Sequence, residues 1–261
     1  MRHEIDMKKF NIHTDMAIDV INNKKVGIKK KNRVFGGIKV TDILLSNKNK
    51  LNKKSGSYVT IEYDDISDYD NYKKVKKIFR IEFEKVLKKM KFNRNNLALI
   101  VGLGNKNSTP DSLGAKITEN IIATRHIKKI KKLDKNYINV ATITPGVEAQ
   151  TGINSFEVIK AVVDSIKPNL LIVFDSLVTN SINRINKTIQ INNVGINPGS
   201  GISKEYQEIS FDTLKIPVIA IGVPTVLSYD NILVTVKEID YMIEKTSLLI
   251  SSAINDYISN V

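Results

Sequence analysis

The stretch LALIVGLG at residues 97–104 decides the fold, together with a second apolar run, LLIVF, at residues 170–174. Short, continuous apolar runs of this kind are typical of strands that are buried on both faces of a parallel sheet. Elsewhere in the chain, runs that fit strands alternate with runs of helical periodicity. This alternation predicts an α/β fold, a single domain with a largely parallel or mixed sheet flanked by helices.

The other elements are predicted from periodicity and from capping residues. Strands are expected at 34–45, 57–63, 138–143, 187–192 and 216–222, the first two forming a hairpin-like pair around a polar stretch. Helices are expected at 70–91, from Pro110, at 155–166 and after residue 238. Asn154 with Glu157 has the spacing of a capping box, and Thr235 with Glu238 repeats it.

Composition excludes several kinds of chemistry. The chain has no cysteine, which removes thiol nucleophiles, disulfides and thiolate metal sites. A metal would need oxygen or imidazole ligands, and the histidines are His3, His13 and His126. The first twenty residues lack an apolar signal-peptide core, and the longest apolar run, 216–227, is too short and interrupted to span a bilayer. We therefore expect a cytoplasmic protein.

The formal net charge of +13 is unevenly distributed. Residues 1–96 hold 24 Lys and Arg against 12 Asp and Glu, whereas residues 97–261 hold 16 against 15. The densest runs are KKVGIKKKNR (24–33) and KKVKKIFR (73–80), and the second interleaves with apolar residues at helical spacing. This pattern favours a solvated basic surface over a specific nucleic-acid site.

Two aspartates follow the two apolar runs that decide the fold. Asp111 lies in the loop after the first run, and Asp175 directly follows the second. Because the carboxyl ends of parallel strands meet at one edge of a sheet, we expect these carboxylates to converge, where they could activate a water. Structural alternatives stay open. Asp111 could be a first-turn acid behind a Thr109 cap and Pro110, and Asp175 could cap a following helix.

The glycine-containing loops carry weaker signals. The loop after residue 101 is neither a GxGxxG nor a Walker A sequence, so a nucleotide site is not expected there. Two further loops, GINPGSG (195–201) and IGVPTV (221–226), suit close backbone approach to a bound chain, although tight turns alone would also explain them.

Six blocks of sequence together resemble the germination protease family of spore-forming bacteria. They are VGLGNKNSTPDSLG (101–114), TRH (124–126), TPGVEAQTG (144–152), FDSLVTNSINRINKTIQI (174–191), GINPGSG and KIPVIAIGVPTV (215–226), and the match runs in order from about residue 10 to residue 260. The resemblance implies a cytoplasmic endopeptidase of the spore core that starts the degradation of small acid-soluble spore proteins. It also implies a homotetramer, a fold like that of the hydrogenase-maturation peptidases, no cofactor, and a catalytic pair at Asp111 and Asp175.

The resemblance further implies a zymogen in which residues 1–15 are a propeptide and residues 16–261 the peptidase domain. The family prefers an acidic residue before the cut, an apolar one after it and then alanine, and Asp15, Met16 and Ala17 match this order. Self-cleavage is therefore expected between Asp15 and Met16. His13 replaces an arginine common in the family, and a segment inserted after IGVPTV in longer members is missing. Both departures concern regulation more than catalysis.

A metal-assisted mechanism and an RNA-directed function are the weaker alternatives. The family commonly has histidine where this chain has Asn197, which disfavours an imidazole-ligated metal. GLGN followed by TRH also resembles peptidyl-tRNA hydrolase, but there the catalytic histidine stands much closer, whereas His126 comes 21 residues after Asn105. A non-catalytic basic binding protein is weaker still. We expect small acid-soluble spore proteins as partners, with no membrane and no specific nucleic-acid binding.

Overall fold

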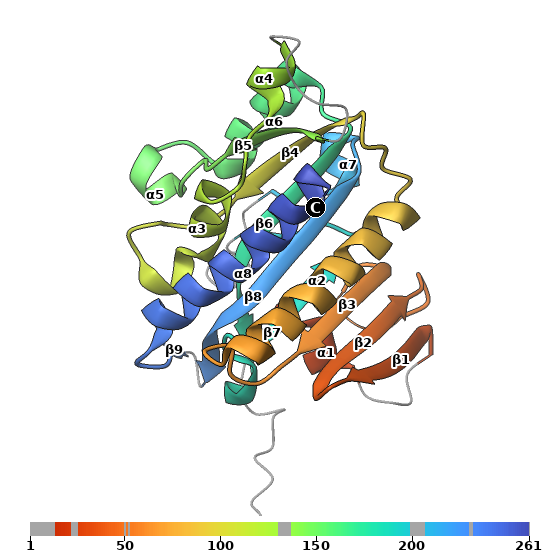
Figure 1. Cartoon of the computed structure of the whole chain (residues 1–261), viewed down its shortest axis with the longest axis vertical. Coiled ribbons are helices and arrows are strands. Elements are labelled where there is room, and N and C mark those ends of the chain that lie inside the picture. The colour runs from red at the N-terminus through yellow and green to blue at the C-terminus, as the bar shows by residue number, and fades with distance from the viewer. Residues whose placement is uncertain are drawn as a thin grey trace, which may run out of the picture.

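A computed structural model describes residues 14–21, 26–49, 51, 53–129, 137–198, 207–229 and 232–260. Within these residues one nine-stranded sheet forms the centre of the molecule, in the order β1-β2-β3-β7-β8-β6-β4-β5, with β9 paired to β8 (Figure 1). The strands are β1 (Ile28–Phe35), β2 (Ile38–Leu45), β3 (Gly56–Glu62), β4 (Leu97–Gly102), β5 (Asn139–Ile143), β6 (Leu170–Thr179), β7 (Thr188–Asn192), β8 (Val218–Tyr229) and β9 (Ile232–Val234).

The sheet is mixed, as predicted. Strands β5, β4, β6 and β8 pair in parallel, whereas β7, β3, β2 and β1 continue the sheet with antiparallel pairings. The predicted strand runs at 97–103 and 170–174 correspond to β4 and the first half of β6, and both lie in the parallel half. Each is fully buried because helices cover both faces of the sheet there.

Helices cover the two faces of the sheet in separate groups (Figure 1). One face packs against α2 (Tyr69–Lys89), α3 (Leu113–Glu119) and α8 (Ile239–Ser259) in the largest apolar cluster. The other face packs against α6 (Ser155–Ile166) and α7 (Phe211–Leu214), and further along against α1 (Ala17–Val20). The remaining short elements are η1 (Thr109–Asp111), α4 (Arg125–Lys129), α5 (Glu148–Thr151) and η2 (Ile182–Arg184).

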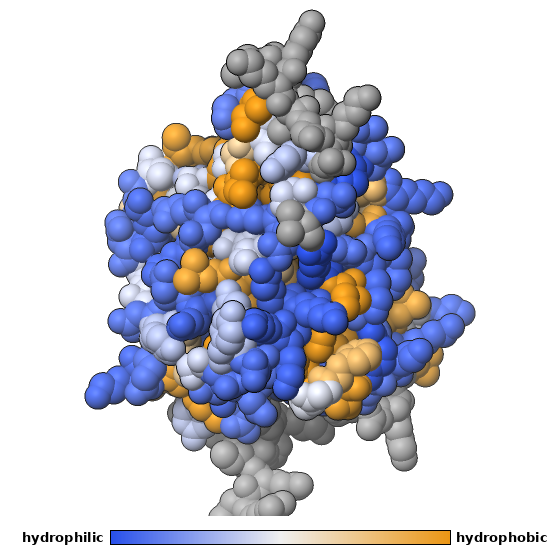
Figure 2. Space-filling view, in the orientation of Figure 1, coloured by the Kyte–Doolittle hydropathy of each residue, from blue (hydrophilic) through white to orange (hydrophobic). Residues whose placement is uncertain are grey.

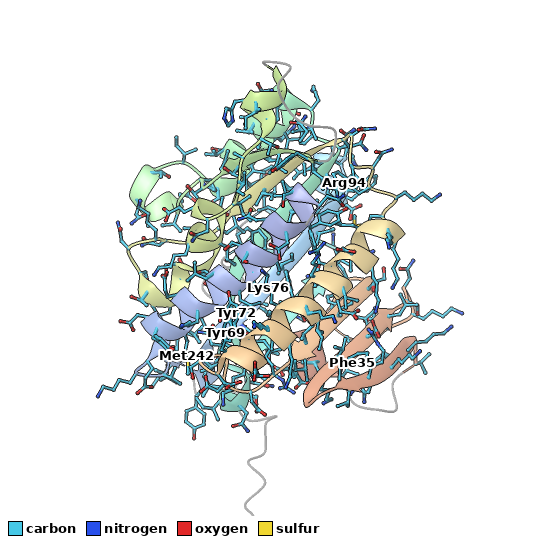
Figure 3. The ribbon with its side chains drawn as sticks, viewed as in Figure 1. Phe35, Tyr69, Tyr72, Lys76, Arg94 and Met242 are labelled. Carbon is cyan, nitrogen blue, oxygen red and sulfur yellow. The ribbon has the colours of Figure 1, made fainter. Side chains whose placement is uncertain are left out.

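The pair α2 and α8 closes the first face. Phe79 and Phe83 of α2 stack with ring centroids 6.0 Å apart, within the core. At the margin Lys76 pairs with Asp256 at 2.8 Å, and Arg94 donates to the carbonyl oxygen of Tyr257 at 3.0 Å. Lys76 and Arg94 are labelled in Figure 3 beside the two helices. Apolar burial with polar contacts at the rim thus fixes α8 across the sheet.

The basic N-terminal part of the chain forms a hairpin at the edge of the sheet. The expected single strand at 34–45 is wrong, because Gly36 and Gly37 have φ values of +54° and +89° and turn the chain between β1 and β2. The lysines of β1 are exposed on this edge strand, where charge discourages pairing with other chains. The face drawn in Figure 2 is hydrophilic over most of its area, with smaller hydrophobic patches.

Two of the predicted helix starts differ from the structure. The helix expected from Pro110 with Thr109 as its cap begins instead as the single turn η1, and α3 starts at Leu113. The capping box expected at Thr235 is also wrong, because Thr235 donates to the carbonyl oxygen of Thr225 at 2.7 Å and Glu238 precedes α8 without a side-chain cap. Asn154 does cap α6, accepting from the Phe156 amide at 2.9 Å.

The IGVPTV segment is also not a loop. It lies inside β8, which runs from Val218 to Tyr229 and pairs along β6, with an irregularity of register beside Leu177. The parallel half of the sheet is therefore longer than the apolar runs indicate. Pro224 pairs with Leu177 at this irregularity, which is the kind of position where a sheet tolerates proline, because proline has no N–H to donate to the ladder.

Candidate active site

Asp175 lies within β6 and not after it. It pairs with Gly222 of β8, and β6 continues to Thr179, so the alternative that Asp175 caps a helix is wrong. Its side chain is on the same face of the sheet as Val173 and Leu177, by strand alternation. Only 8% of Asp175 is exposed, and its Oδ1 accepts from the Ser176 amide at 2.9 Å. A carboxyl thus directly follows five buried apolar residues within the strand.

Asp111 lies in η1, in the turn that follows β4. Its carboxylate Oδ2 accepts from the backbone amide of Asn105 at 2.8 Å, which closes the intervening loop. Asp111 thus ends the single turn η1 ahead of α3, without the Thr109 cap of the structural alternative, and its carboxylate organises the loop around it. Its side chain is partly buried, which raises its pKa, while the Asn105 amide acts in the opposite direction.

Backbone contacts bring the end of β4 close to β6. The amide of Leu103 donates to the carbonyl oxygen of Phe174 at 2.9 Å. The start of α3 packs closely on both strands at Gly114, where an added Cβ would lie 2.5 Å from the Leu103 oxygen and 2.6 Å from the Phe174 oxygen. This close packing explains why glycine occupies position 114 and sets the Asp111 turn beside Asp175.

The two carboxyl groups interact electrostatically. Burial raises the pKa of Asp175 well above its ordinary value, and the charges of Asp111 and then Asp15 raise it further. Like charges in a site of low polarity disfavour simultaneous ionisation, so the pair retains a proton at a higher pH than an isolated aspartate would. This is the electrostatic arrangement that acid and base catalysis by two carboxyls requires.

The described N-terminal residues lie along the same part of β6. The amide of Asp15 donates to the carbonyl oxygen of Val178 at 2.9 Å, and the Val178 amide donates to Asp15 Oδ2 at 2.9 Å. Met16 and Ala17 are completely buried and pack in one apolar cluster with Leu177 of β6. The predicted cleavage site at Asp15 and Met16 thus lies along β6, where the charge of Asp15 acts on Asp175.

Two residues that the sequence did not single out contact this peptide segment. Lys53 Nζ donates to the carbonyl oxygens of Thr14 and Asp15, both at 3.0 Å. Gln190 Nε2 lies 3.4 Å from the Asp15 oxygen, and Gln190 Oε1 accepts from the Ala17 amide at 2.8 Å. Lys53 lies among other lysines and carries no signal, but a glutamine inside the fully buried strand β7 could have been noticed.

Asp19 anchors the segment on the far side of Ala17. Its carboxylate accepts from the hydroxyls of Thr14 at 2.7 Å and Thr179 at 2.9 Å, and from the Asn180 amide at 3.2 Å. It also pairs with Arg184 of η2. A buried carboxylate with these partners is satisfied, so the chain after Ala17 is held firmly against the end of β6.

The remaining predicted positions are dispersed or lie outside the described residues. His3 and His13 are outside them, and His126 lies in α4. Asn197 is exposed. Over the described ranges, no group of three or more His, Cys, Asp or Glu side chains is arranged to hold a metal ion. The described helices include none long and apolar enough to cross a membrane.

Fold and site together define an α/β protein in which two interacting carboxyls and a bound stretch of its own chain share one end of the sheet. The sequence profile described as Peptidase_A25, germination protease, matches residues 4–247. Germination proteases of Bacillus licheniformis and Bacillus velezensis are 39% and 38% identical to this chain over 259 and 258 residues. In both comparisons the alignment covers 93% of this chain and 70% of the relative.

The germination protease of Bacillus subtilis is 36% identical over 259 residues, with the same coverage. The chain therefore belongs to the germination protease family and is a peptidase. The family resemblance predicted from the six sequence blocks is confirmed, and the family match gives no support to the alternative of a peptidyl-tRNA hydrolase.

Proposed function

We propose that this peptidase is an endopeptidase of the spore core that degrades small acid-soluble spore proteins as a homotetramer. It is made as a zymogen, in which residues 1–15 are the propeptide and residues 16–261 the peptidase domain. Asp111 and Asp175 are the catalytic pair. The observation that carries this proposal is the position of Asp15 and Met16, the predicted cleavage site, against β6 beside Asp175, whose pKa responds to the charges of both Asp111 and Asp15.

The proposed chemistry divides the work between the two carboxyls. Burial raises the pKa of Asp175 more than that of Asp111, because Asp175 is the more buried of the two carboxyls. Asp175 therefore holds the proton that the pair retains. Asp111 then accepts a proton from the attacking water, and Asp175 supplies one to the peptide group that is cleaved. The proton afterwards returns from Asp111 to Asp175, which restores the pair.

Digestion of a purified small acid-soluble spore protein tests the catalytic pair. The wild type, Asp111→Asn and Asp175→Asn would be compared, each with and without a chelator. We expect each variant to lose at least about 100-fold in rate and the chelator to leave the wild type unchanged. Full activity in both variants would remove the site assignment, and chelator sensitivity would require a metal in the mechanism.

Mass spectrometry of the intact chain tests the self-cleavage. Wild-type protein under activating conditions is expected to lose residues 1–15, and Asp175→Asn is expected to keep them. A wild-type N-terminus that stays intact while spore protein is still digested would reject the zymogen and leave the protease. Sedimentation velocity measures the tetramer independently of both reactions.

A further inference from the structure

We propose that Lys53 and Gln190 form a clamp that holds the peptide backbone at the cleaved bond and stabilises the negative charge that develops on its carbonyl oxygen. The inference rests on the proposed function, because it takes the bond between Asp15 and Met16 as the one that is cut. Both clamp residues contact atoms of the backbone, so the same clamp would receive any substrate chain that binds in this register.

Gln190 sets the register of the bound chain. Its side-chain amide spans the cleaved bond, because Nε2 lies 3.4 Å from the Asp15 oxygen before it while Oε1 accepts from the Ala17 amide beyond it at 2.8 Å. Gln190 is 3% exposed in β7, between Ile189 and Ile191, which pack in the core on the opposite face. Because the backbone of Gln190 is held in a buried strand, its side chain can position a peptide with the geometric precision that catalysis needs.

Lys53 places positive charge on the oxygen that becomes anionic. Its ammonium lies 3.0 Å from the carbonyl oxygen of Asp15 and is partly buried, where its interaction with an oxyanion is stronger than in water. The same group contacts the carbonyl oxygen of Thr14 at 3.0 Å, so it is held by two successive peptide units. Both contacts exist before the reaction, and the one to Asp15 strengthens as charge accumulates.

The clamp completes the reaction sequence without further reactants. The water oxygen bonds to the carbonyl carbon of Asp15 while Asp111 takes a water proton, and the carbonyl oxygen becomes an oxyanion held by Lys53 and Gln190. The bond from that carbon to the Met16 nitrogen then breaks as the carbonyl re-forms, and the nitrogen takes the proton of Asp175. The products are a new carboxyl terminus at Asp15 and a new amino terminus at Met16.

Steady-state digestion of a purified spore protein by the full chain tests the clamp. Lys53→Met is expected to lower kcat by about 100-fold to 1000-fold, with KM changed much less, because the charge acts mainly on the transition state. Lys53→Arg should recover part of kcat. Lys54→Met is the matched control, since Lys54 is the exposed neighbour that pairs with Glu208 and Asp212. Gln190→Met should lower kcat and also raise KM, because it removes contacts on both sides of the bond.

The outcomes separate the clamp from the proposed function. A wild type that cuts neither itself nor the spore protein would overturn the proposed function, and the clamp with it. An active wild type with a folded Lys53→Met of unchanged kcat would overturn the clamp alone, as would a Lys53→Met that changes only KM. Urea unfolding identifies any variant that fails to fold, and Lys53→Gln, a neutral donor for which a lowered kcat is also expected, then replaces Lys53→Met.

Discussion

Gly104 lies directly against Asp111. The φ angle of Gly104 is +95°, and a Cβ at this position would lie 2.1 Å from the carbonyl oxygen of Asp111 and 2.8 Å from its Oδ1. No side chain fits in that space. The position of the Asp111 carboxylate therefore depends in part on residue 104 having no side chain.

Gly104→Ala should consequently displace Asp111. We expect proteolysis of a spore protein to fall about 100-fold, since a shift of about 1 Å in a catalytic group can cost that much, and stability to fall by about 1–3 kcal/mol from backbone strain. Gly36→Ala is the control, because Gly36 also has a positive φ, +54°, but nothing lies within 4 Å of its Cβ position. It should lose stability and keep its activity. Equal activity in both variants would show that Gly104 does not position the site.

Asp175→Asn should stabilise the fold while it removes proteolysis. The folded-state pKa of Asp175 is raised, mainly by burial, so its protonated form favours the fold at low pH and this advantage is lost as pH rises through the folded pKa. The neutral amide avoids that loss. At neutral pH we expect the variant to be more stable than the wild type by about 1–3 kcal/mol.

Urea unfolding at several pH values measures this difference. The gain should shrink towards zero as pH falls below the ordinary range of an aspartate, where the wild-type carboxyl is protonated in both states. Asp64→Asn, at an exposed loop position, is the control and should leave stability within about 0.5 kcal/mol of the wild type. A gain that does not depend on pH would mean that Asp175 is not the group responsible.

Asp111→Asn should lower the pKa of Asp175 without returning it to an ordinary value. Burial is the largest cause of the raised pKa and remains in the variant, as does the charge of Asp15, whereas the charge of Asp111 is removed. Carboxyl carbon chemical shifts in Asp-labelled protein would follow the titration. An unchanged pKa at Asp175 would show that the two carboxyls do not interact, and the proposed catalytic pair would fail.

The fold was largely predictable because burial on both faces leaves a clear pattern. The runs that became β4 and β6 are continuous and apolar, and the face of α2 that packs on the sheet has helical spacing. The hairpin of β1 and β2 was missed because β1 is an exposed edge strand of lysines without alternation. Its turn is set by the positive φ angles of Gly36 and Gly37. The prediction of one continuous strand over residues 34–45 did not take this turn into account.

Only those residues of the candidate site that stand out in their local stretch of sequence could be predicted. Asp175 directly follows an apolar run and Asp111 lies in the turn after another, so both attract attention along the chain. Lys53 and Gln190 became visible only through pairings between distant segments, since Gln190 lies beside Ala17 across 173 residues of sequence. Contacts between residues so far apart in sequence depend on the order of the strands in the sheet. The position of β7 between β3 and β8 could not be predicted from the local sequence pattern.

A separate buried ion pair joins the basic hairpin to α2. Arg33 of β1 donates to both carboxylate oxygens of Glu82, at 2.7 and 2.9 Å, and Glu82 is only 2% exposed. Burial opposes ionisation of Glu82, but hydrogen bonds from Arg33 and Lys85 outweigh it and lower the pKa of Glu82. Arg33 also contacts Asp42 of β2, at 2.7 Å, so one side chain connects both strands of the hairpin to the helix.

Arg33→Met should therefore destabilise the protein by about 3–5 kcal/mol, because it leaves Glu82 charged and buried with less compensation. The loss should be largest above the ordinary pKa of a glutamate and should shrink as pH falls and Glu82 becomes protonated. Arg33→Met combined with Glu82→Met should recover much of the stability, as measured by urea unfolding. Proteolysis per folded molecule should stay unchanged in both variants, and a loss of activity in the folded double variant would show that the hairpin also supports the site.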